Sequence, residues 1–442
     1  MEQQDASGDR TARRWANHVV RATLLVLLLG SGQGPWSHAA TQAEVDAAWV
    51  RGLAWLLTHQ NPDGSWGAQH GTEVAATATT VEVLHRLGLR NHAYLFGVAW
   101  LANAETGSVD SRARKVVGLR TAGHDVSADL ATLSAWRKST GGWGAYSQLA
   151  ASFPDTALAA RAVQDLNGGA VCNILYAQKQ SNNPEVNGSW SYLYEMYAYF
   201  YSERLASTSA SALVPTVVNI QALQELMTSS TLICYRHGWA TETYTKANVL
   251  NSAIAWLLGQ RRHSDGGFGD EGASTAFETG LVYEVLRVHR PTESATLAAL
   301  EFLLAHQDDW YRDAFHAATI LRTLPDPGPT LFVDTNNDSV PDTMIDTDGD
   351  GVPDAVEAYL QQSPSTPDSR WLANPYDGDL NQDGVVDAAD VALADLIASG
   401  QLAATVVHLR HGDVAPPGAP DGVVDVADVI RIQGKALGLE AF

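Results

Sequence analysis

The chain contains little cysteine, little methionine and few positive charges. Of its 442 residues, two are Cys and four are Met, and 28 Lys and Arg stand against 50 Asp and Glu. Nucleic-acid phosphates are bound by clusters of Lys and Arg, which this sequence lacks, so we expect no nucleic-acid partner. Neither Cys belongs to a C-x-x-C pair, which leaves a structural zinc site with little support. The length is compatible with about two to four domains.

The negative charge is concentrated in the last quarter of the chain. From Asp334 to the C-terminus there are 18 Asp and 2 Glu against 3 Arg and 1 Lys, which accounts for −16 of the total formal charge of −22. An excess confined to one segment indicates ligands for a cation rather than a general property of the surface.

No apolar run is long enough to cross a bilayer, which takes about 20 residues. The short run Ala22–Gly30 follows four Arg residues and precedes the small residues of Ser37-His-Ala39. This order is typical of an export signal, residues 1–39, with cleavage after Ala39. A disordered tail with a chance apolar patch is the alternative. We therefore expect a secreted or cell-surface protein with no transmembrane segment in the mature chain, and a periplasmic location also fits.

The two cysteines, Cys172 and Cys234, are expected to form one disulfide, because an exported protein meets oxidising conditions. Cys172 opens one predicted helix of an antiparallel pair, and Cys234 follows the end of the other, so the two ends should lie close together. Two buried thiols, or half of a metal site, are the alternatives.

The most informative motif is a calcium-loop pattern in the acidic segment. An EF-hand loop places oxygen ligands at positions 1, 3, 5, 9 and 12, a backbone carbonyl at position 7, and Gly at position 6 for the sharp turn. Here Gly351 occupies position 6. An acidic, solvated linker is the alternative, although a linker does not need this order. The residues at the ligand positions are Asp346, Asp348, Asp350, Val352, Asp354 and Glu357.

Three further stretches repeat this pattern with increasing departures. In the second of these stretches, Asp413 supplies position 1 if Ala415–Pro420 bulges out as a four-residue insertion. The third stretch has Ser339 in place of Gly at position 6. We predict that these loops bind calcium, since so many ligands suit its flexible shell better than that of magnesium. The ligand positions are Asp379, Asn381, Asp383, Val385, Asp387 and Asp390 in the first, Asp413, Asp421, Val423, Asp425 and Asp428 in the second, and Asp334, Asn336, Asp338 and Asp342 in the third.

Residues 46–324 contain an internal repeat. The stretch Asp63–Leu84 aligns without a gap with a later copy that begins at Asp265. Each unit has an apolar helix, a Gly-rich turn with one large aromatic residue, and a second helix rich in Ala, Thr and Val. Six pairs can be counted if 94–120 is taken as a pair with a weak motif. The other second helices are predicted at 72–87, 155–166, 215–226, 274–288 and 313–324.

Small side chains on the second helices suit crowding around a common axis, and six pairs can close into a ring that leaves no open end. The unit Gln60–Gly67, which ends in Asp-Gly-Ser-Trp-Gly, resembles the repeat of squalene and hopene cyclases and of protein prenyltransferase β subunits. The resemblance implies a mainly α fold, an α6/α6 toroid over 46–324. It also implies that the aromatic of each unit is a structural clamp, with a sugar-stacking surface as the alternative. These aromatics are Trp66, Trp143, Trp190 and Phe268.

Two resemblances extend beyond the toroid. After a linker at 325–333, the loops within 334–362 resemble thrombospondin type 3 calcium repeats. After a second linker at 363–376, residues 377–442 resemble a type I dockerin, in which each of two calcium loops precedes a helix, here Ala388–Ser399 and Val426–Leu437. The two loop–helix units should pack together through apolar residues, which are Val385, Val391, Leu393, Leu396 and Ile397 of the first and Val423, Val429, Ile430 and Ile432 of the second. A dockerin implies a cohesin-like or cell-surface partner. The hydroxyl pair of many cellulosomal dockerins is replaced by Ala388 and Ala389, which questions the partner but not the calcium fold.

The chemistry known for related toroids is not visible in the sequence. Class II terpene cyclases protonate an alkene with an Asp-x-Asp-Asp motif, and Asp125 and Asp129 have the wrong spacing for it. A prenyltransferase zinc site would need a His and an Asp that cannot be identified. The thioester motif Cys-Gly-Glu-Gln is absent, because Asn follows Cys172 and Tyr follows Cys234. The catalytic residues are therefore unknown.

Four polar residues at the starts of second helices are candidates for one mouth of the ring, although capping and solvation explain them equally simply. We expect a secreted, calcium-binding toroid used for binding or an unidentified activity and tethered by its dockerin-like tail. A carbohydrate-active enzyme that binds a glycan is the alternative, since such enzymes often use paired carboxylates, and a terpene cyclase-like enzyme is a second. The mouth candidates are Glu73, Asp155, Glu278 and His316.

Overall fold

The computed structural model describes most of the chain after the N-terminal 39 residues. The described residues are 40–61, 63–67, 71–192, 211–236, 240–270, 272–329, 331–333, 343–347, 352–361, 363–365, 376–381, 385–402, 404, 406–417 and 421–440. The expected export signal therefore lies outside them. No helix among them is both long and apolar enough to span a membrane.

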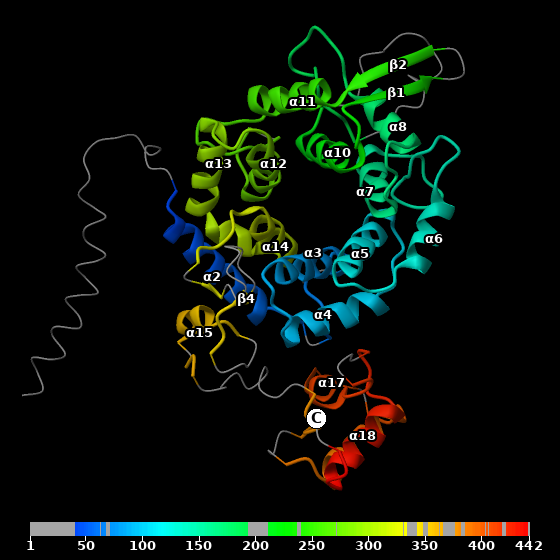
Figure 1. Cartoon of the computed structure of the whole chain (residues 1–442), viewed down its shortest axis with the longest axis vertical. Helices are drawn as coiled ribbons and strands as arrows, with labels where there is room; N and C mark the ends of the chain where they lie inside the picture. Colours follow the sequence, from blue (N-terminus) through cyan, green and yellow to red (C-terminus); the bar gives the residue numbers. More distant parts are fainter. Residues whose placement is uncertain are drawn as a thin grey trace, which may run out of the picture. The chain divides into compact units, whose positions relative to one another are not determined.

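Twelve of the described helices form two concentric layers (Figure 1). The inner helices contact one another in the order α3, α5, α7, α10, α12, α14 and back to α3, which closes the circle. This is the six-pair toroid expected from the sequence. The outer helices are α2 (Gln42–Thr58), α4 (His92–Asn103), α6 (Ser127–Trp136), α8 (Gly169–Ala177), α11 (Lys246–Gln260) and α13 (Ser294–Ala305), and the inner ones are α3 (Glu73–Arg86), α5 (Val109–Thr121), α7 (Phe153–Val163), α10 (Leu213–Leu226), α12 (Ala276–His289) and α14 (Ala314–Thr323).

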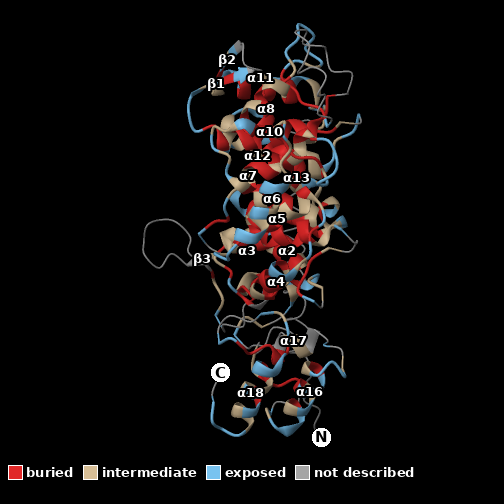
Figure 2. Ribbon diagram, turned by 90° about the vertical axis from the view of Figure 1, so that its right-hand side faces the viewer, coloured by how far each residue is buried: buried red, intermediate tan, exposed pale blue. Residues whose placement is uncertain are grey.

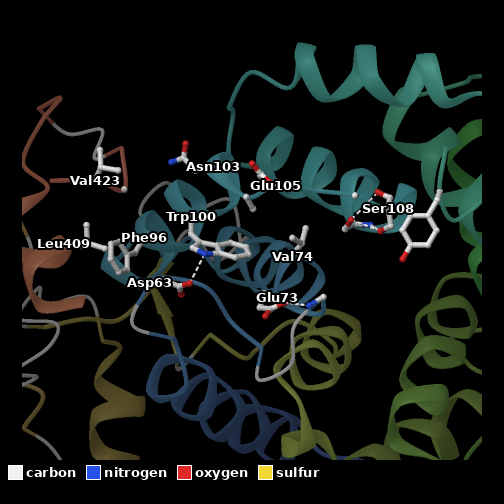
Figure 3. Close-up of a pocket in the computed structure, with 16 residues that line it drawn as sticks. Asp63, Glu73, Val74, Phe96, Trp100, Asn103, Glu105, Ser108, Leu409 and Val423 are labelled. Carbon is white, nitrogen blue, oxygen red and sulfur yellow. Dashed lines mark hydrogen bonds between the residues drawn. The ribbon is translucent and has the colours of Figure 1, made fainter. Parts of the chain in front are cut away.

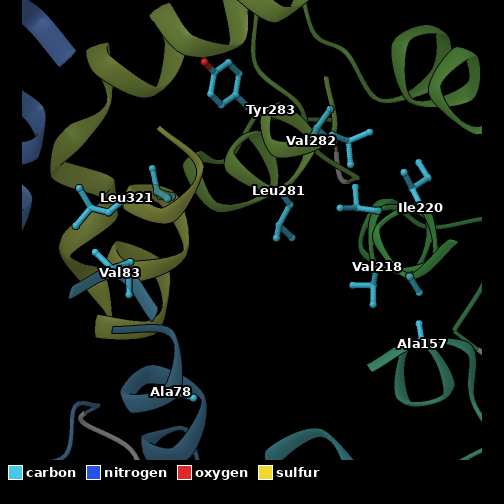
Figure 4. Close-up of a cluster of buried hydrophobic side chains, with 14 of the residues drawn as sticks. Ala78, Val83, Ala157, Val218, Ile220, Leu281, Val282, Tyr283 and Leu321 are labelled. Carbon is cyan, nitrogen blue, oxygen red and sulfur yellow. The ribbon is translucent and has the colours of Figure 1, made fainter. Parts of the chain in front are cut away.

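Small residues allow the inner helices to approach one another closely. A Cβ atom added to Gly118 of α5 would lie 3.1 Å from Ala78 of α3, and one added to Gly280 of α12 would lie 3.1 Å from Ile320 of α14. The buried residues are concentrated in the helices of the ring (Figure 2). In Figure 4, Leu281 lies on the side of α12 that faces the interior of the ring, whereas Ala157 lies on the side of α7 that faces α10.

The aromatic residue of each repeat is a buried clamp. Trp66, Trp143, Trp190 and Phe268 are all fully buried. The indole N–H of each Trp donates to a carbonyl of the preceding outer helix, for example from Trp66 to Leu56 at 2.8 Å. The backbone N–H of each aromatic donates to a Thr hydroxyl near the start of an inner helix, at 2.9–3.1 Å. The pairs are Trp66–Thr77, Trp143–Thr156, Trp190–Thr216 and Phe268–Thr279.

The segment 325–333, which was predicted to be a linker, packs against the first helix pair. The indole N–H of Trp49 on α2 donates to the carbonyl of Pro325 at 2.8 Å, and the N–H of Gly328 donates to the carboxylate of Asp46 at 2.7 Å. Arg86 of α3 donates to the carbonyl of Leu324 at 3.1 Å. The Pro-rich stretch therefore lies against the first helix pair and does not lead freely away from the ring.

A hairpin and a disulfide cover one side of the fourth pair. Strands β1 (Thr231–Arg236) and β2 (Ala240–Thr245) are antiparallel, with Cys234 opposite Glu242. The structure contains the disulfide between Cys172, on α8, and Cys234, which is the pairing that the sequence favoured. The hairpin was not predicted from the sequence, and it holds Cys234 beside the outer helix α8.

The segment after the ring adds to the same hydrophobic core. It contains strands β3 (Phe332–Val333) and β4 (Thr343–Met344) and helix α15 (Asp354–Leu360), which contacts α2. Met344, Val352 and Val356 are buried within the main core. This part of the expected calcium segment is therefore packed as a layer on the toroid. A six-residue 3-10 helix, η2 (Gln307–Arg312), precedes α14.

The C-terminal segment has a small core of its own. Helices α16 (Ala388–Ala398) and α18 (Val426–Ala436) pack together, and a short helix α17 (Val406–Gly412) lies between them in sequence. Five apolar residues expected in this core are there: Ile397 and Ile432 are buried, and Val391, Leu393 and Val429 pack against them. Four others are not, because they lie on outward faces of the two loop–helix units. These exposed residues are Val385, Leu396, Val423 and Ile430.

Candidate functional site

Two of the four mouth candidates are parts of helix caps. The side chain of Thr275 accepts the N–H of Glu278 at 3.1 Å and donates to its carboxylate at 2.8 Å. Ser152 makes the same two bonds with Asp155 at the start of α7. Burial raises the pKa of Asp155 above its ordinary value, although the hydrogen bond from Ser152 opposes the shift. Both carboxylates therefore have a structural task at the first turn of an inner helix.

The other two candidates lie in different surroundings. Glu73 accepts the N–H of Gly71 at 2.6 Å and lines a pocket at the start of α3. His316 of α14 lies against Phe277 of α12, with ring centroids 4.4 Å apart, and burial lowers the pKa of this imidazole. The guanidinium of Arg114, on α5, lies 4.8 Å from the ring centroid of Phe315 beside it. The structure therefore gathers an aromatic group around His316 and does not join the four candidates in one cluster.

Glu73 belongs to a pocket of about 640 Å³. Its toroid wall combines the α2–α3 turn, helix α4 and the start of α5. Figure 3 shows Trp100 in the middle of this wall, between Phe96 and Val74. The indole N–H of Trp100 donates to the carboxylate of Asp63 at 3.0 Å. Further toroid residues of the lining are Gly71, Asn103, Ala104, Glu105, Gly107, Ser108, Ser111 and Tyr146.

A charged layer links four inner helices further along their length. Arg322 of α14 lies 3.3 Å from the carboxylate of Glu82 on α3 and 3.1 Å from that of Glu284 on α12. Gln221 of α10 donates to Glu284 at 2.8 Å. Burial disfavours the charge of Arg322, but Glu284 and Glu82 outweigh this effect and raise its pKa above the ordinary value. The three charged side chains are largely buried, with exposed fractions of 21% for Arg322, 19% for Glu82 and 22% for Glu284.

The acidic pair nearest in sequence to a cyclase motif lies elsewhere. Asp125 accepts the N–H and the hydroxyl of Ser127 just before α6, an outer helix. Asp129 in the first turn of α6 is paired with Arg112, and Lys115 lies 3.6 Å away. These carboxylates cap and brace an outer helix, which gives them no place among the residues facing the interior of the ring.

The loop before α18 contains two buried carboxylates. Asp413 and Asp428 are 0% and 1% exposed. Asp413 accepts the N–H groups of Asp421 and Gly422, at 3.2 and 2.7 Å. Burial raises the pKa of Asp413 to about 7, although these two N–H groups oppose the shift. The contact between Asp413 and residues 421–422 brings position 1 beside position 5, which is the arrangement that the four-residue insertion requires.

The loop before α16 repeats the same geometry around its last ligand position. Asp390 is fully buried and accepts the N–H groups of Asn381 and Asp387, at 3.1 and 2.9 Å. Asp428 accepts those of Ala415 and Asp425, at 2.7 and 2.8 Å. Ala415 thus corresponds to Asn381, at position 3 of the loop. In both units the position-9 residue, Asp387 or Asp425, also caps the helix that follows.

Several predicted ligands lie outside the described residues. They are Asp334, Asn336, Asp338, Asp342, Asp348, Asp350 and Asp383. In the described part of the first loop, Asp354 accepts the N–H and hydroxyl of Thr347, both at 2.6 Å, and Glu357 is fully buried. Asp346 and Val352 also belong to this part, and Asp379, Val385 and Val423 to those of the other loops. Among all described residues, no three His, Cys, Asp or Glu side chains converge on a common metal position.

Sequence reasoning missed the Thr clamps, the charged layer and the pocket around Trp100. The repeat did contain a signal for the first two, because Thr77 and Glu82 recur as Thr279 and Glu284 at the same offset as the aromatic turns. Trp100 gave no signal of its own, since its motif-poor pair lacks the repeated turn. Its environment arises only when α4 packs beside the preceding turn.

Comparisons with known proteins found distant matches among solved structures. No family model and no curated protein matches the chain. Among solved structures, a variant of the type II terpene cyclase MstE from Scytonema, with its product merosterolic acid A, has a TM-score of 0.46 and 13% identity over 64% of this chain and 96% of its own. The ent-copalyl diphosphate synthase from Streptomyces platensis has a TM-score of 0.39 and 17% identity, over 57% and 48%. A protein from Actinoplanes scores 0.43 with 13% identity, over 64% and 98%.

At such scores and identities these matches carry no argument about activity. The six-pair ring is established by the contacts of this chain's own helices. MstE is named as a type II terpene cyclase, whereas the name of the Actinoplanes protein gives no activity.

Proposed function

We propose that the chain is an exported calcium-binding protein. Calcium orders its C-terminal module, and this module attaches the helical toroid to a partner. The observation that supports this most directly is the repeated geometry of Asp390 and Asp428. Each is buried at the last ligand position of its loop, and each is held by the backbone N–H groups of positions 3 and 9. Two independent loops with the same buried carboxylate are expected of a duplicated metal-binding unit.

The chemistry of the donors fits a hard dication. In the loop before α18, Asp413, Asp421, Asp425 and Asp428 would supply carboxylate oxygens and Val423 a backbone carbonyl. Burying Asp413 and Asp428 without a cation is costly, and burial raises the pKa of both. A dication would offset that cost, so metal binding and folding of the module should be coupled. In the loop before α16, Asp379, Asp387 and Asp390 would have the same task.

The described carboxylates do not form a finished site. Asp421 and Asp425 each accept an N–H two residues further along, at 3.2 and 2.6 Å. Binding calcium would require these side chains to turn from their own backbone towards the ion. The proposal therefore predicts a change in the loops on calcium binding, with α16 and α18 as the packed part of the module.

An exposed apolar stripe supports docking through α18. Val426, Ile430 and Leu437 are 65%, 62% and 65% exposed. The corresponding positions of α16 are occupied by Ala388, Ala392 and Ser399. The two halves of the module therefore share a core but differ on their outer faces. We expect one protein partner, on a cell surface or scaffold, to bind the α18 face through an apolar patch of its own.

Calcium titration of the complete chain tests the metal. We expect chelation with EDTA to remove a low-temperature transition in calorimetry while leaving the helical signal of the ring, because only the module would depend on the ion. Asp390→Asn and Asp428→Asn should each remove about one calcium equivalent. Asp395→Asn, an exposed change on α16, is the matched control. A calorimetric trace unchanged by EDTA would contradict the proposal.

The docking face has a separate test. Ile430→Ser should abolish calcium-dependent capture of the chain by the producing cell's surface fraction, while Ala392→Ser at the equivalent position of α16 should not. Both variants must bind calcium normally for the comparison to count. Equal capture in calcium and EDTA would leave the segment as a structural calcium module without a tethering role.

A further inference from the structure

We propose that the pocket around Trp100 binds a neutral glycan, and that this is the binding function of the toroid. The inference rests on the proposed toroid protein and adds a ligand class to it. Leu409, Gly422 and Val423 of the C-terminal module also line the pocket, so binding is measured with calcium present. Its starting point is the combination of a fixed aromatic side chain with oxygen-rich neighbours on the toroid wall (Figure 3).

Two aromatic side chains provide surfaces for sugar rings. Trp100 is partly buried, and its indole N–H is held by Asp63 at 3.0 Å, which fixes the plane of the ring. Tyr146, which also lines the pocket, is 47% exposed. By contrast, the clamp residues Trp66 and Trp143 of the neighbouring turns are fully buried. The aromatics of this pocket are therefore available to a ligand in a way that the repeat aromatics are not.

The polar groups around these rings suit hydroxyl groups. Asp63, Glu73 and Glu105 offer carboxylate oxygens, Ser108 offers a hydroxyl, and Asn103 offers its side-chain carbonyl, since its amide nitrogen donates to Ala99 and Asp421. A pyranose has an apolar C–H face that can lie on an aromatic ring and an edge of hydroxyls that donate to carboxylates. A purely apolar ligand would remove water from these carboxylates without replacing its hydrogen bonds, which is costly.

The charge of the lining decides which glycans fit. Among the described residues, the lining contains three carboxylates and no Lys, Arg or His. An anionic sugar, such as a uronic acid, would bring a further negative charge against Asp63, Glu73 and Glu105 without a cation to compensate. We therefore expect neutral oligosaccharides to bind and anionic ones to be rejected.

The test uses the complete chain and isothermal titration with cellohexaose, xylohexaose, mannohexaose and oligogalacturonate. At least one neutral hexasaccharide should bind saturably, with quenching of tryptophan fluorescence, and oligogalacturonate should not bind. Trp100→Ala should raise the Kd for the neutral ligand by about tenfold or more, and Trp100→Phe, which keeps a flat ring, by much less. Tyr146→Ala should weaken binding several-fold, whereas Tyr235→Ala, at an exposed position on β1, should have no effect.

The possible outcomes of these experiments decide whether the pocket around Trp100 binds a neutral glycan. A Trp100→Ala chain that fails to fold is replaced as evidence by Tyr146→Ala, because Tyr146 is half-exposed and its removal should leave the melting curve unchanged. The inference is overturned if no neutral hexasaccharide binds, if both aromatic variants bind normally, or if only a polyamine such as spermidine binds. Calcium titration of the same variants should be unaltered, so failure here and failure of the calcium module are distinguishable.

Discussion

Removing the guanidinium from the charged layer should destabilise the ring and make its stability depend on pH in a particular direction. Arg322 stands between Glu82 and Glu284, at 3.3 and 3.1 Å, and so links α14 to α3 and α12. Arg322→Leu would leave two carboxylates in a largely buried place without a cation. Breaking a buried ion pair costs about 3–5 kcal/mol, and the residual exposure of roughly a fifth suggests about 2–4 kcal/mol here.

The pH dependence of the Arg322→Leu variant follows from the same geometry. Without Arg322, the negative charges of Glu82 and Glu284 would lie unpaired in a largely buried place of the folded variant. Acid relieves such a charge more in the folded state than in the solvated unfolded chain, so the loss of stability relative to the unmodified chain should be smaller at pH 5 than at pH 7. Changing the two glutamates to Gln in the same variant should restore most of the loss, because no unpaired charge remains.

Urea unfolding followed by circular dichroism at 222 nm, with calcium present at pH 7 and pH 5, measures this effect. Arg312→Leu is the matched control, since its partner is Asp309 on the same short helix and its side chain is 74% exposed, where a pair contributes little. Equal losses in the two Arg→Leu variants, or a loss in Arg322→Leu that does not shrink at pH 5, would refute the reasoning.

Three further changes probe other parts of the toroid. Cys172→Ala with Cys234→Ala opens a loop of 62 residues and should lower the free energy of unfolding by about 4 kcal/mol in the chain-entropy model, measured by urea denaturation; an unchanged midpoint would contradict this. Thr156→Val leaves the N–H of Trp143 without its acceptor at 3.0 Å and should cost about 1–3 kcal/mol, whereas Thr132→Val on the exposed α6 should cost little. His316→Gln should reduce the stability lost between pH 7 and pH 5, because burial lowers the pKa of His316 in the folded state and its contribution is therefore lost as pH falls through the unfolded value; parallel pH curves would argue against it.

The repeated part of the fold could be predicted because its motif occurs several times in the sequence. The repeated turn of Asp63 and Asp265, with its large aromatic, gave the number of helix pairs and the structural task of Trp66 and Phe268. Thr77 and Glu82 also recur in the repeat. However, the role of a hydroxyl or carboxylate on a helix cannot be predicted until its hydrogen-bond or ion-pair partner is known. Arg322, the partner of Glu82, comes from a helix 240 residues away in sequence.

Features that depend on packing between units could not be predicted. The spacing around Asp413 allowed an insertion, and the contact with Gly422 shows how the chain accommodates it. The exposed positions of Val423 and Ile430 were misjudged because apolar character alone does not tell which side of a helix meets a neighbour. Trp100 was overlooked for a similar reason, since the Asp63 carboxylate that fixes it belongs to the preceding unit.

The seam at Pro325–Gly328 has a consequence for how the protein is made. Its hydrogen bonds to α2 join residues 276 to 284 positions apart, for example Trp49 to Pro325 and Gln42 to Asp326. The first helix pair is synthesised long before the seam segment, so its seam-facing side stays exposed until 240 further residues, from Arg86 to Asp326, have been added. Contacts of such long range are slow to form, and an incomplete ring offers apolar surfaces to other chains in the meantime. Nascent chains truncated before 325 should therefore be held by chaperones, and release should coincide with synthesis of the seam.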